Sequence, residues 1–422
     1  MELVSFEEIE RLLAQERRQD MSSILHGAVD PGRTLRMLLE ADDIDVSDPD
    51  VCALCGQLGL GHILERGLRF LSTGEIRKSL LARALAKDPR LLVIDDPFDG
   101  LDRDSQSELS RVIHRAATGE RAIVIVGGRA RDRLPEVTHE LQIDGGVVQY
   151  AGPLRSAASE SADLVASHPH FQIPAVVTDA QKHAETGTEL ISMNDVFVSY
   201  GSTPILRNID WSVRAGTHWM VFGPNGSGKS TLLSLVSGEN PKAYGQQIEL
   251  FGRRRGSGES VAEIRRHIGF VSGDLQLRFP LRTGVLDTVV SGFFDTVGLF
   301  SEPAGLQVKL ARQWLERLSL AWAEERRLRD LSFGQRRLLL IARAVVKGPQ
   351  LLIADEPCQG LDEQYTHAVL DLLESIGSRR ESTLLYVTHN VEEKVPCIDY
   401  ILKLEPDNQT GSRAMVLPAG RV

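Results

Sequence analysis

The stretch Gly223-Pro224-Asn225-Gly226-Ser227-Gly228-Lys229-Ser230-Thr231 contains the eight-residue phosphate-binding pattern G-x-x-x-x-G-K-[ST]. An apolar run that can form a strand precedes it at 218–222, and apolar spacing typical of a helix follows at 232–236. Glycines in such a loop let backbone N–H groups turn inward around phosphate oxygens, and the next helix points its positive end at the same anion. The stretch therefore predicts a strand, a phosphate-binding loop and a helix.

The loop also predicts which atoms hold the phosphates of a nucleoside triphosphate. Lys229 is expected to reach the β- and γ-phosphates, and the hydroxyl of Ser230 is expected to hold Mg²⁺. The full set of residues that we expect around the phosphates is Gly223, Asn225, Gly226, Gly228, Lys229, Ser230 and Thr231.

Size and composition narrow the class of protein. The 422 residues suffice for two or three domains. The chain has 48 basic and 58 acidic residues, which gives a net charge of −10. This charge argues against a broad surface for nucleic acid or anionic membrane, so no nucleic acid is expected as a partner. No apolar run reaches the length of a membrane span, the first residues lack a signal-peptide layout, and four cysteines are too few for a disulfide framework. We expect a soluble, cytoplasmic protein.

An ordered set of motifs occurs twice along the chain. The first copy has Ser72 in Leu-Ser-Thr-Gly-Glu and the second has Ser332 in Leu-Ser-Phe-Gly-Gln. Each is followed by a helical pattern and then by an apolar run that ends in aspartate, Asp95 or Asp355, 23 positions after the serine in both copies. Apolar runs of this kind are typical of strands buried on both faces of a parallel sheet. The fold is therefore predicted to be α/β, twice.

The repeat and the composition divide the chain into four parts. We expect a partial first domain at 1–150, a linker rich in Ser, Ala, Thr, His and Pro at 151–189, a complete second domain at 190–404, and a short irregular tail at 405–422.

These motifs, in this order and spacing, resemble the nucleotide-binding domains of ABC ATPases. Gly223–Thr231 is similar to the Walker A loop, 331–335 to the signature, 351–356 to Walker B, 360–362 to the D-loop and 388–389 to the H-loop. The resemblance implies two such domains, each with a mixed, mostly parallel sheet and a helical subdomain. It also implies ATP hydrolysis, with ATP and Mg²⁺ as the bound groups.

The same resemblance assigns roles to side chains of the second copy. Asp355 and Ser230 would hold Mg²⁺, Glu356 would act as the general base, and His389 would lie near the γ-phosphate. Tyr200 stands where the family places an aromatic ring that stacks on adenine, although a structural strand aromatic is an equally good reading.

Two further runs resemble the ModF/PhrA-type tandem ABC proteins associated with molybdate transport: 95–102 and 251–260. This resemblance implies work in or beside the uptake of molybdate or a related oxyanion, with a membrane permease or another protein as partner and a position at the inner face of the cell membrane. In the second run, Arg253 to Arg255 form either a solvated turn or a contact for phosphate or nucleic acid.

One departure from the family concerns coupling to membrane partners. The family places a glutamine after a strand such as 268–271, but this chain has Ser272-Gly273 there, and the nearest glutamine is Gln276. Coupling to a membrane channel therefore depends on whether Gln276 can take the role.

The first copy departs further. Ser332 lies 109 positions after Gly223, but Ser72 has only 71 residues ahead of it, so no loop of this type precedes it at the matching distance. Asp96 replaces Glu356, and Gly127-Gly128-Arg129 stands where Thr388-His389 would fall. We expect the first copy to be unable to hydrolyse ATP alone and to leave apolar strand surface open. As the cause we expect a mis-called start codon or a truncated coding region rather than a reduced domain.

ABC sites are composite, because the loop of one domain faces the signature of the other. The resemblance thus implies head-to-tail pairing of the two copies, in which Ser72, Gly74 and Glu75 close over a nucleotide held by Lys229. We predict one working ATP site per chain. The alternatives are an ATP-gated regulatory switch and a non-transport translation factor, although the segment 151–189 is shorter and less charged than the linker of such factors.

Overall fold

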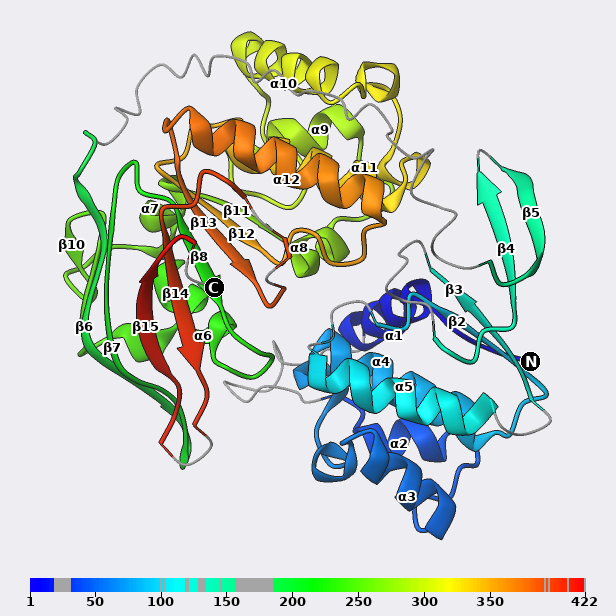
Figure 1. Cartoon of the computed structure of the whole chain (residues 1–422). Helices are drawn as coiled ribbons and strands as arrows, with labels where there is room; N and C mark the ends of the chain where they lie inside the picture. The colour runs from blue at the N-terminus through cyan, green and yellow to red at the C-terminus, as the bar shows by residue number, and fades with distance from the viewer. Residues whose placement is uncertain are drawn as a thin grey trace. The chain divides into compact units, whose positions relative to one another are not determined.

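The computed structural model describes residues 1–18, 32–98, 101, 103–117, 121–127, 134–144, 146–155, 185–390, 392–393, 395–407 and 410–420. The chain forms two compact units, Met1–Ser167 and His168–Val422, which are described here one at a time (Figure 1). No helix among the described residues is long and apolar enough to cross a membrane.

The second unit is built from two sheets and the helices that cover them. Its elements are β6 (Glu189–Tyr200), β7 (Thr203–Arg214), β8 (Trp219–Phe222), α6 (Lys229–Val236), β9 (Gln247–Leu250), β10 (Arg253–Arg254), α7 (Val261–Arg266), β11 (Ile268–Ser272), α8 (Gly273–Arg278), α9 (Val285–Val290), α10 (Gly305–Arg317), α11 (Phe333–Val345), β12 (Leu351–Asp355), α12 (Glu363–Ser378), β13 (Thr383–Thr388), β14 (Tyr400–Glu405) and β15 (Arg413–Pro418).

The central sheet has the order β11-β12-β13-β8-β14-β15, and its strands are parallel except for β15. Alternate residues of its middle strands enter two different cores. Leu352 and Leu384 pack on the side of helices α9 to α12, whereas Leu351 and Leu385 pack with α6 and the antiparallel sheet β10-β9-β6-β7. Burial on both faces explains why these strands read as continuous apolar runs.

The first unit repeats one half of this plan. Its elements are β1 (Glu2–Val4), α1 (Phe6–Arg18), α2 (Leu35–Glu40), α3 (Pro49–Gln57), α4 (Thr73–Ala86), β2 (Leu91–Asp95), α5 (Arg103–Ala117), β3 (Ala122–Val126), β4 (His139–Asp144) and β5 (Val147–Pro153). The sheet β1-β2-β3 is parallel, as is β11-β12-β13, and the α/β class predicted for both copies is confirmed. β4 and β5 form a separate antiparallel hairpin.

The strand that opens the chain corresponds to β11. Val4 pairs with Ile94 as Val271 pairs with Ala354. A serine directly after β1 and the last residue of β11 each cap the next helix, since Ser5 Oγ accepts the N–H of Glu8 at 3.3 Å and Ser272 Oγ accepts the N–H of Leu275 at 3.0 Å. The first unit therefore enters the shared plan at the strand before the helical region.

Two predicted boundaries differ from the structure. The tail expected at 405–422 contains β15, which pairs with β14 from Tyr400↔Pro418 to Glu405↔Arg413 and extends the central sheet. Its residues 414–417 form a short apolar run, and the strand pairs along its whole length with the edge of β14. The predicted linker begins inside β5 and ends at the start of β6, and its residues 156–184 lie outside the described part.

Candidate functional site

The predicted phosphate-binding loop lies between β8 and α6. Gly226 and Gly228 have φ of +79° and +86°, a region that favours glycine. A Cβ at Gly228 would lie 2.8 Å from Leu206 Cδ2, and one at Gly223 would lie 2.6 Å from Ser227 Oγ. Backbone conformation therefore favours glycine at 226 and 228, and packing leaves little room for a side chain at 223 and 228.

Lys229 is buried at the first turn of α6 and folds back over the loop. Its Nζ donates to the carbonyl oxygens of Gly223 at 2.8 Å and Pro224 at 3.1 Å. Ser230 is exposed beside it, and within the described part of the chain its hydroxyl makes no hydrogen bond. The loop thus presents a cation and an unengaged hydroxyl at the N-terminus of a helix, where an anion is favoured.

The acidic residues of the site follow β12. Asp355 is the last residue of β12, and Glu356 follows it with φ of +44°. Because β12, β13 and β8 are parallel neighbours, their carboxyl ends meet at one edge of the sheet, where α/β proteins bind ligands. Glu356 Oε1 accordingly lies 3.8 Å from Lys229 Nζ and 3.1 Å from His389 Nδ1.

The charges of this cluster influence one another. Burial, followed by the neighbouring charge of Glu356, raises the pKa of Asp355 to about 7. Burial also works against the charge of Glu356, but the hydrogen bond and charge of His389 and the charge of Lys229 outweigh it, so the pKa of Glu356 is lowered. The same contact with Glu356 overcomes burial at His389 and raises its pKa. Glu356 is therefore ionised at neutral pH.

A cation suits Asp355 in particular. Its carboxylate accepts no hydrogen bond from the residues described, and its environment disfavours the charged form. A divalent cation would stabilise that charge, and carboxylate and hydroxyl oxygens are ligands that Mg²⁺ prefers. Asp355 and Ser230 therefore fit the role of Mg²⁺ ligands.

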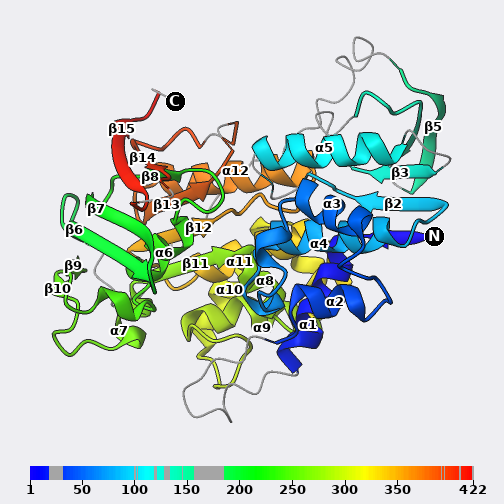
Figure 2. The ribbon, with the colours of Figure 1, turned by 90° about the horizontal axis from the view of Figure 1, so that it is seen from below.

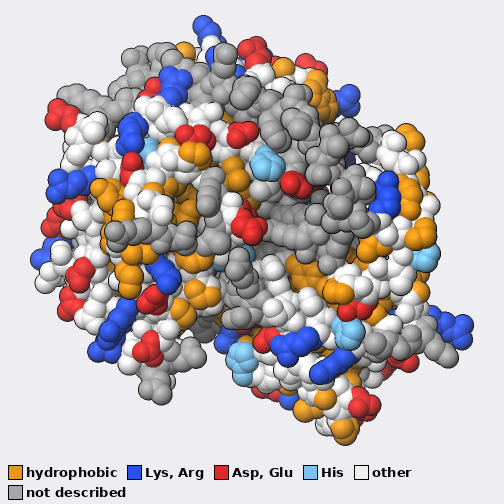
Figure 3. Space-filling model, viewed as in Figure 1, with side chains coloured by type: hydrophobic (Ala, Val, Ile, Leu, Met, Phe, Trp, Pro, Cys, Tyr) orange, Lys and Arg blue, Asp and Glu red, His pale blue; other side chains and the backbone are white. Residues whose placement is uncertain are grey.

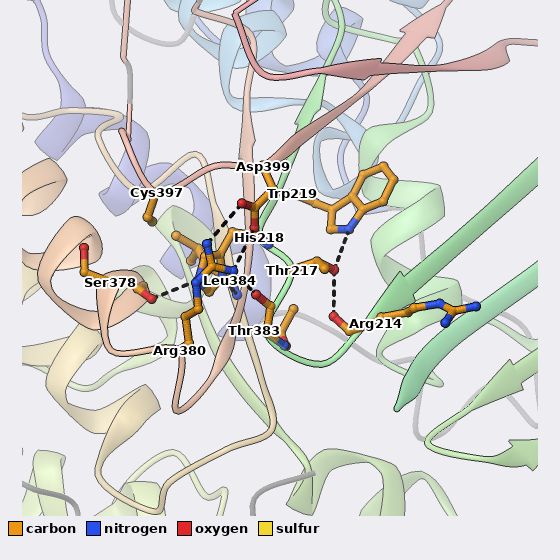
Figure 4. A network of polar contacts seen from close by, with 12 residues as sticks. Arg214, Thr217, His218, Trp219, Ser378, Arg380, Thr383, Leu384, Cys397 and Asp399 are labelled. Carbon is orange, nitrogen blue, oxygen red and sulfur yellow. Dashed lines mark hydrogen bonds and ion pairs between the residues drawn. The ribbon is translucent and has the colours of Figure 1, made fainter. Parts of the chain in front are cut away.

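The strand that leads into the loop is anchored at its start by His218 (Figure 4). This fully buried imidazole donates from Nε2 to Gly377 O at 2.8 Å, and its Nδ1 accepts the N–H of Leu384 at 2.9 Å. Its own N–H donates to Asp399, which is paired with Arg380. Burial lowers the pKa of His218 more than the contact with Gly377 O raises it, so the ring is neutral.

Tyr200 lies at the end of β6 with its side chain about half exposed. Its hydroxyl accepts a hydrogen bond from Asn240 Nδ2 at 3.0 Å, and Asn240 also bonds to Ser234 Oγ of α6. The side chain is thus held at its hydroxyl and is partly open to solvent, and the adenine contact stays a prediction for this residue.

The signature serines begin the helices α4 and α11 in the two units. Ser72 and Ser332 each form a capping box, with Glu75 and Gln335 respectively. Glu75 is therefore engaged in its own helix, where its carboxylate accepts the N–H of Ser72 at 2.7 Å. Ser72, Gly74 and Glu75 belong to the first unit, and their approach to the loop of the second unit stays a prediction.

Sequence reasoning missed the arginine that supports the site. Arg337, 1% exposed, donates to Gln276 Oε1 at 2.8 Å and to the carbonyl oxygens of Glu356 and Gln359. Arg77 occupies the matching position of α4 and donates to Asp96 O at 2.6 Å. An arginine five positions after both signature serines was the signal that could have found this support.

Asp96 and Glu356 share their backbone geometry as well. Their φ values are +43° and +44°, and each N–H donates to the strand beyond, to Val126 O at 2.8 Å or Val387 O at 2.9 Å. The acidic position after Walker B is thus built in the same way in both units, but it carries the shorter aspartate in the first. Gly128 and Arg129, together with Asp99, Gly100 and Asp102 of the first D-loop, lie outside the described residues.

The chain was compared with known proteins. The ABC transporter family model matches residues 206–359. The chain is 38% identical over 426 residues to the ABC transporter ATP-binding protein ModF of Escherichia coli, covering 96% of this chain and 84% of that protein. It is 31% identical to an uncharacterized ABC transporter ATP-binding protein of Schizosaccharomyces pombe, covering 81% and 69% of the two chains.

One solved structure extends the likeness of fold across both units. It is described as a model of ribosome-bound archaeal Pelota and ABCE1, and it aligns with a TM-score of 0.63 at 20% identity, covering 92% of this chain and 62% of that one. At this identity the likeness concerns the fold alone. Together with the loop, the ends of the strands and the paired signature helices, the identity to ModF shows that the chain belongs to the family of ABC transporter ATP-binding proteins.

Proposed function

We propose that the second unit binds ATP with Mg²⁺ and hydrolyses it. The observation that carries this proposal is the convergence of Lys229, Asp355, Glu356 and His389 at the carboxyl ends of β8, β12 and β13. Phosphoryl transfer to water requires charge neutralisation and an oriented water, with little covalent help from the protein. The four side chains supply these two requirements.

Each residue has a defined task in this proposal. The N–H groups of the loop and Lys229 hold the phosphates, and Glu356 accepts a proton from the attacking water while His389 orients the carboxylate. Mg²⁺, held by Ser230 and Asp355, supplies positive charge at the phosphate oxygens. A triphosphate that draws Lys229 towards itself removes one cation from Glu356, so the carboxylate becomes more basic when ATP is bound.

The first unit is proposed to complete the same site without a nucleotide of its own. In this proposal Ser72, Gly74 and Glu75 close over the triphosphate held by Lys229. The support is the motif complement, since residues 1–150 contain a signature and a Walker B strand but no G-x-x-x-x-G-K-[ST], and Asp96 replaces Glu356.

Counting nucleotides tests this arrangement directly. Equilibrium titration of the full chain with a non-hydrolysable ATP analogue and Mg²⁺ should give one site per chain, and Lys229→Ala should abolish it. Ser72→Arg should lower turnover and leave ADP binding intact. A stoichiometry of two, or full activity of Ser72→Arg, would contradict the shared site.

For the cellular role, we propose an ATPase in or beside the uptake of molybdate or a related oxyanion. The support is the 38% identity to ModF along nearly the whole chain. The test is purification of Glu356→Gln with ATP from the native cell, because this variant should retain the ATP-bound state and its partner. Recovery of a membrane permease supports transport, and stimulation of turnover by that permease should follow.

A soluble ATP-gated switch is the second candidate, and the position of Gln276 favours it. Gln276 is buried, its Oε1 accepts from Arg337 and its Nε2 donates to Phe333 O at 3.3 Å. It therefore ties α8 to the signature helix, and Gly273 stands at the position of the family's coupling glutamine. Turnover that no membrane fraction changes, but that ribosomes or another soluble partner change, would support this candidate over transport.

A further inference from the structure

A second polar pocket lies in the second unit, apart from the strand ends that form the nucleotide site. Figure 2 shows β9, β10 and α7 grouped at one side of the unit, and the pocket lies among them. Its volume is about 230 Å³, below the roughly 300–1,000 Å³ of pockets for drug-sized ligands. A small ion fits, and a whole nucleotide does not. The polar lining is Arg253, Arg255, Glu259, Glu263, Arg266 and His267.

The acidic residues of the lining are already engaged. Glu259 accepts hydrogen bonds from Arg255, from the N–H of Gly256 at 2.9 Å and from Ser257 Oγ at 3.2 Å. Glu263 accepts the N–H and hydroxyl of Ser260 at 2.8 and 3.2 Å and so caps α7. Their charges are thus held by local hydrogen bonds.

Two arginines of the lining remain without such partners. The side chains of Arg253 and Arg266 make no hydrogen bond and no close ion pair among the described residues, although their charges, after the hydrogen bonds from Ser260, lower the pKa of Glu263. Arg255 is 3% exposed, whereas Arg253 and Arg254 are exposed as the solvated-turn reading expects, and the Nε of Arg255 has no hydrogen-bond partner in the described part of the chain. The pocket therefore carries more positive charge than its own carboxylates neutralise.

His267 adds an unused polar atom beside these arginines. Its Nδ1 is buried and lacks a hydrogen-bond partner among the described residues. Phe251 stacks on the ring, with centroids 4.8 Å apart and planes at 26°. Phe251 and Gly252 form the two-residue turn between β9 and β10, and Phe251 has φ of +51°, which is rare for a bulky residue and a feature often found at functional sites.

We propose that this pocket binds a small tetrahedral oxyanion, either free or as the terminal phosphate of a small metabolite, between Arg253, Arg266 and His267. Guanidinium groups match the oxygens of such anions in charge and geometry, and the buried Nδ1 of His267 gains a partner. Arg255 also donates to Gly238 O at 3.1 Å, so one wall of the pocket contacts the turn that follows α6, the helix that begins at Lys229. The inference does not depend on the proposed ATPase activity.

The imidazole provides a local readout. Burial, and then the charges of Lys347, Arg253 and Arg266, lower the pKa of His267. A bound anion offsets these cations, so titration with inorganic phosphate, sulfate or molybdate should raise the pKa of His267, measured by histidine NMR on the full chain. The signal is assigned by its absence in His267→Gln. Because the readout belongs to one residue, anion bound at Lys229 does not produce it.

Matched variants test the arginines. Arg253→Ala and Arg266→Ala should each lower the affinity for the anion about tenfold or more, as expected for the loss of a charge-assisted hydrogen bond. The control is Arg254→Ala, which removes an exposed arginine of β10 outside the lining. Phe251→Gly should keep the fold, because glycine suits the turn. It should lower the affinity for the anion, because His267 loses the ring that stacks on it.

The outcomes separate the possibilities. If ribose 5-phosphate acts at lower concentration than inorganic phosphate, the ligand is a phosphorylated metabolite; the reverse order indicates a free oxyanion. The site would be overturned if the pKa of His267 did not change at high concentrations of the anion. It would also be overturned if Arg254→Ala lowered the affinity for the anion as much as Arg253→Ala and Arg266→Ala do. Either result counts against the site even if ATP hydrolysis proceeds as proposed.

Discussion

The same pair of strands is buried differently in the two units. In the second unit, every residue of β13 is buried and β12 is buried up to Asp355. In the first unit, β2 alternates between half-buried and buried positions, and β3 alternates between exposed and half-buried ones. One face of the first sheet therefore packs on helices, whereas no described helix or sheet of its unit covers the other face as α6 and the antiparallel sheet cover the second.

Individual side chains show the size of this difference. Val124 pairs with Val93 in the first unit as Leu385 pairs with Ile353 in the second, but Val124 is 46% exposed and Leu385 is fully buried. The hairpin β4–β5 adds further exposed apolar side chains, and Figure 3 shows hydrophobic surface over it. The open apolar face predicted for the first copy is confirmed.

The backbone geometry at Asp96 and Glu356 is the same in both units, although the burial of their sheets differs. Asp96 and Glu356 share their φ, their N–H partner strand and the arginine that contacts their carbonyl. This geometry therefore accompanies the signature helix and the strand that follows it, which both units share.

The largest expected effect separates the two acidic positions. Glu356→Gln should lower the rate of ATP hydrolysis by about 10²–10⁴-fold, because a positioned base is lost. Asp96→Asn, the matched change, should leave the rate nearly unchanged. Steady-state release of phosphate with excess Mg²⁺ and ATP measures both, and equal losses would show that the first unit takes part in the chemistry.

The two alanine substitutions Leu385→Ala and Val124→Ala should differ in their cost to stability, because only Leu385 is buried in its unit. Leu385→Ala should destabilise its unit by about 2–5 kcal/mol, whereas Val124→Ala should change stability by less than about 0.5 kcal/mol. All four tryptophans lie in the second unit, at 211, 219, 314 and 322, so their fluorescence during urea unfolding reports that unit. Hydrogen exchange of β2 reports the first. A large cost for Val124→Ala would mean that its face is covered in solution.

The buried arginines should behave alike. Arg337→Met and Arg77→Met each leave carbonyl oxygens without donors, at about 1–3 kcal/mol for each orphaned group. Arg337→Met should reduce stability more than Arg77→Met, since Gln276 also loses its partner. The same two probes measure the losses, with the exposed Arg327→Met and Arg111→Met as controls in the two units. A negligible loss of stability from one of the two substitutions would show that Arg337 and Arg77 do not support their units in the same way.

Acid should act on the second unit through His218. The pKa of His218 is lowered by burial, so the unfolded chain binds a proton more readily than the folded one. Stability is therefore kept above the ordinary value of 6.5 and lost below it, by up to about 1.4 kcal/mol per pH unit. Thermal melts followed by tryptophan fluorescence between pH 7.5 and 5 should show this slope, and His218→Gln should flatten it. An unchanged slope would assign the acid sensitivity elsewhere.

Motif spacing predicted the α/β repeat and the loop at Lys229, because glycines and a buried aspartate at fixed intervals leave few other structures. Arg337 escaped notice because its partners, the side chain of Gln276 and two backbone carbonyls, lie 19 to 61 positions away, although the matching Arg77 of the first copy offered a signal. β15 was missed although residues 414–417 are apolar, because the run is short and lies beyond the last motif of the repeat. The pocket at Phe251 and His267 joins a turn to the end of a helix sixteen positions later, a distance that no local period reveals.

The outer strand β3 has practical consequences at the bench. Within the described residues it is the terminal strand of its sheet, and Val124 and Val126 stand on its exposed face. Strands of this kind recruit other chains by edge pairing. Purified samples should therefore self-associate as concentration rises, and a lysine at position 124 would be the first change to make before crystallisation.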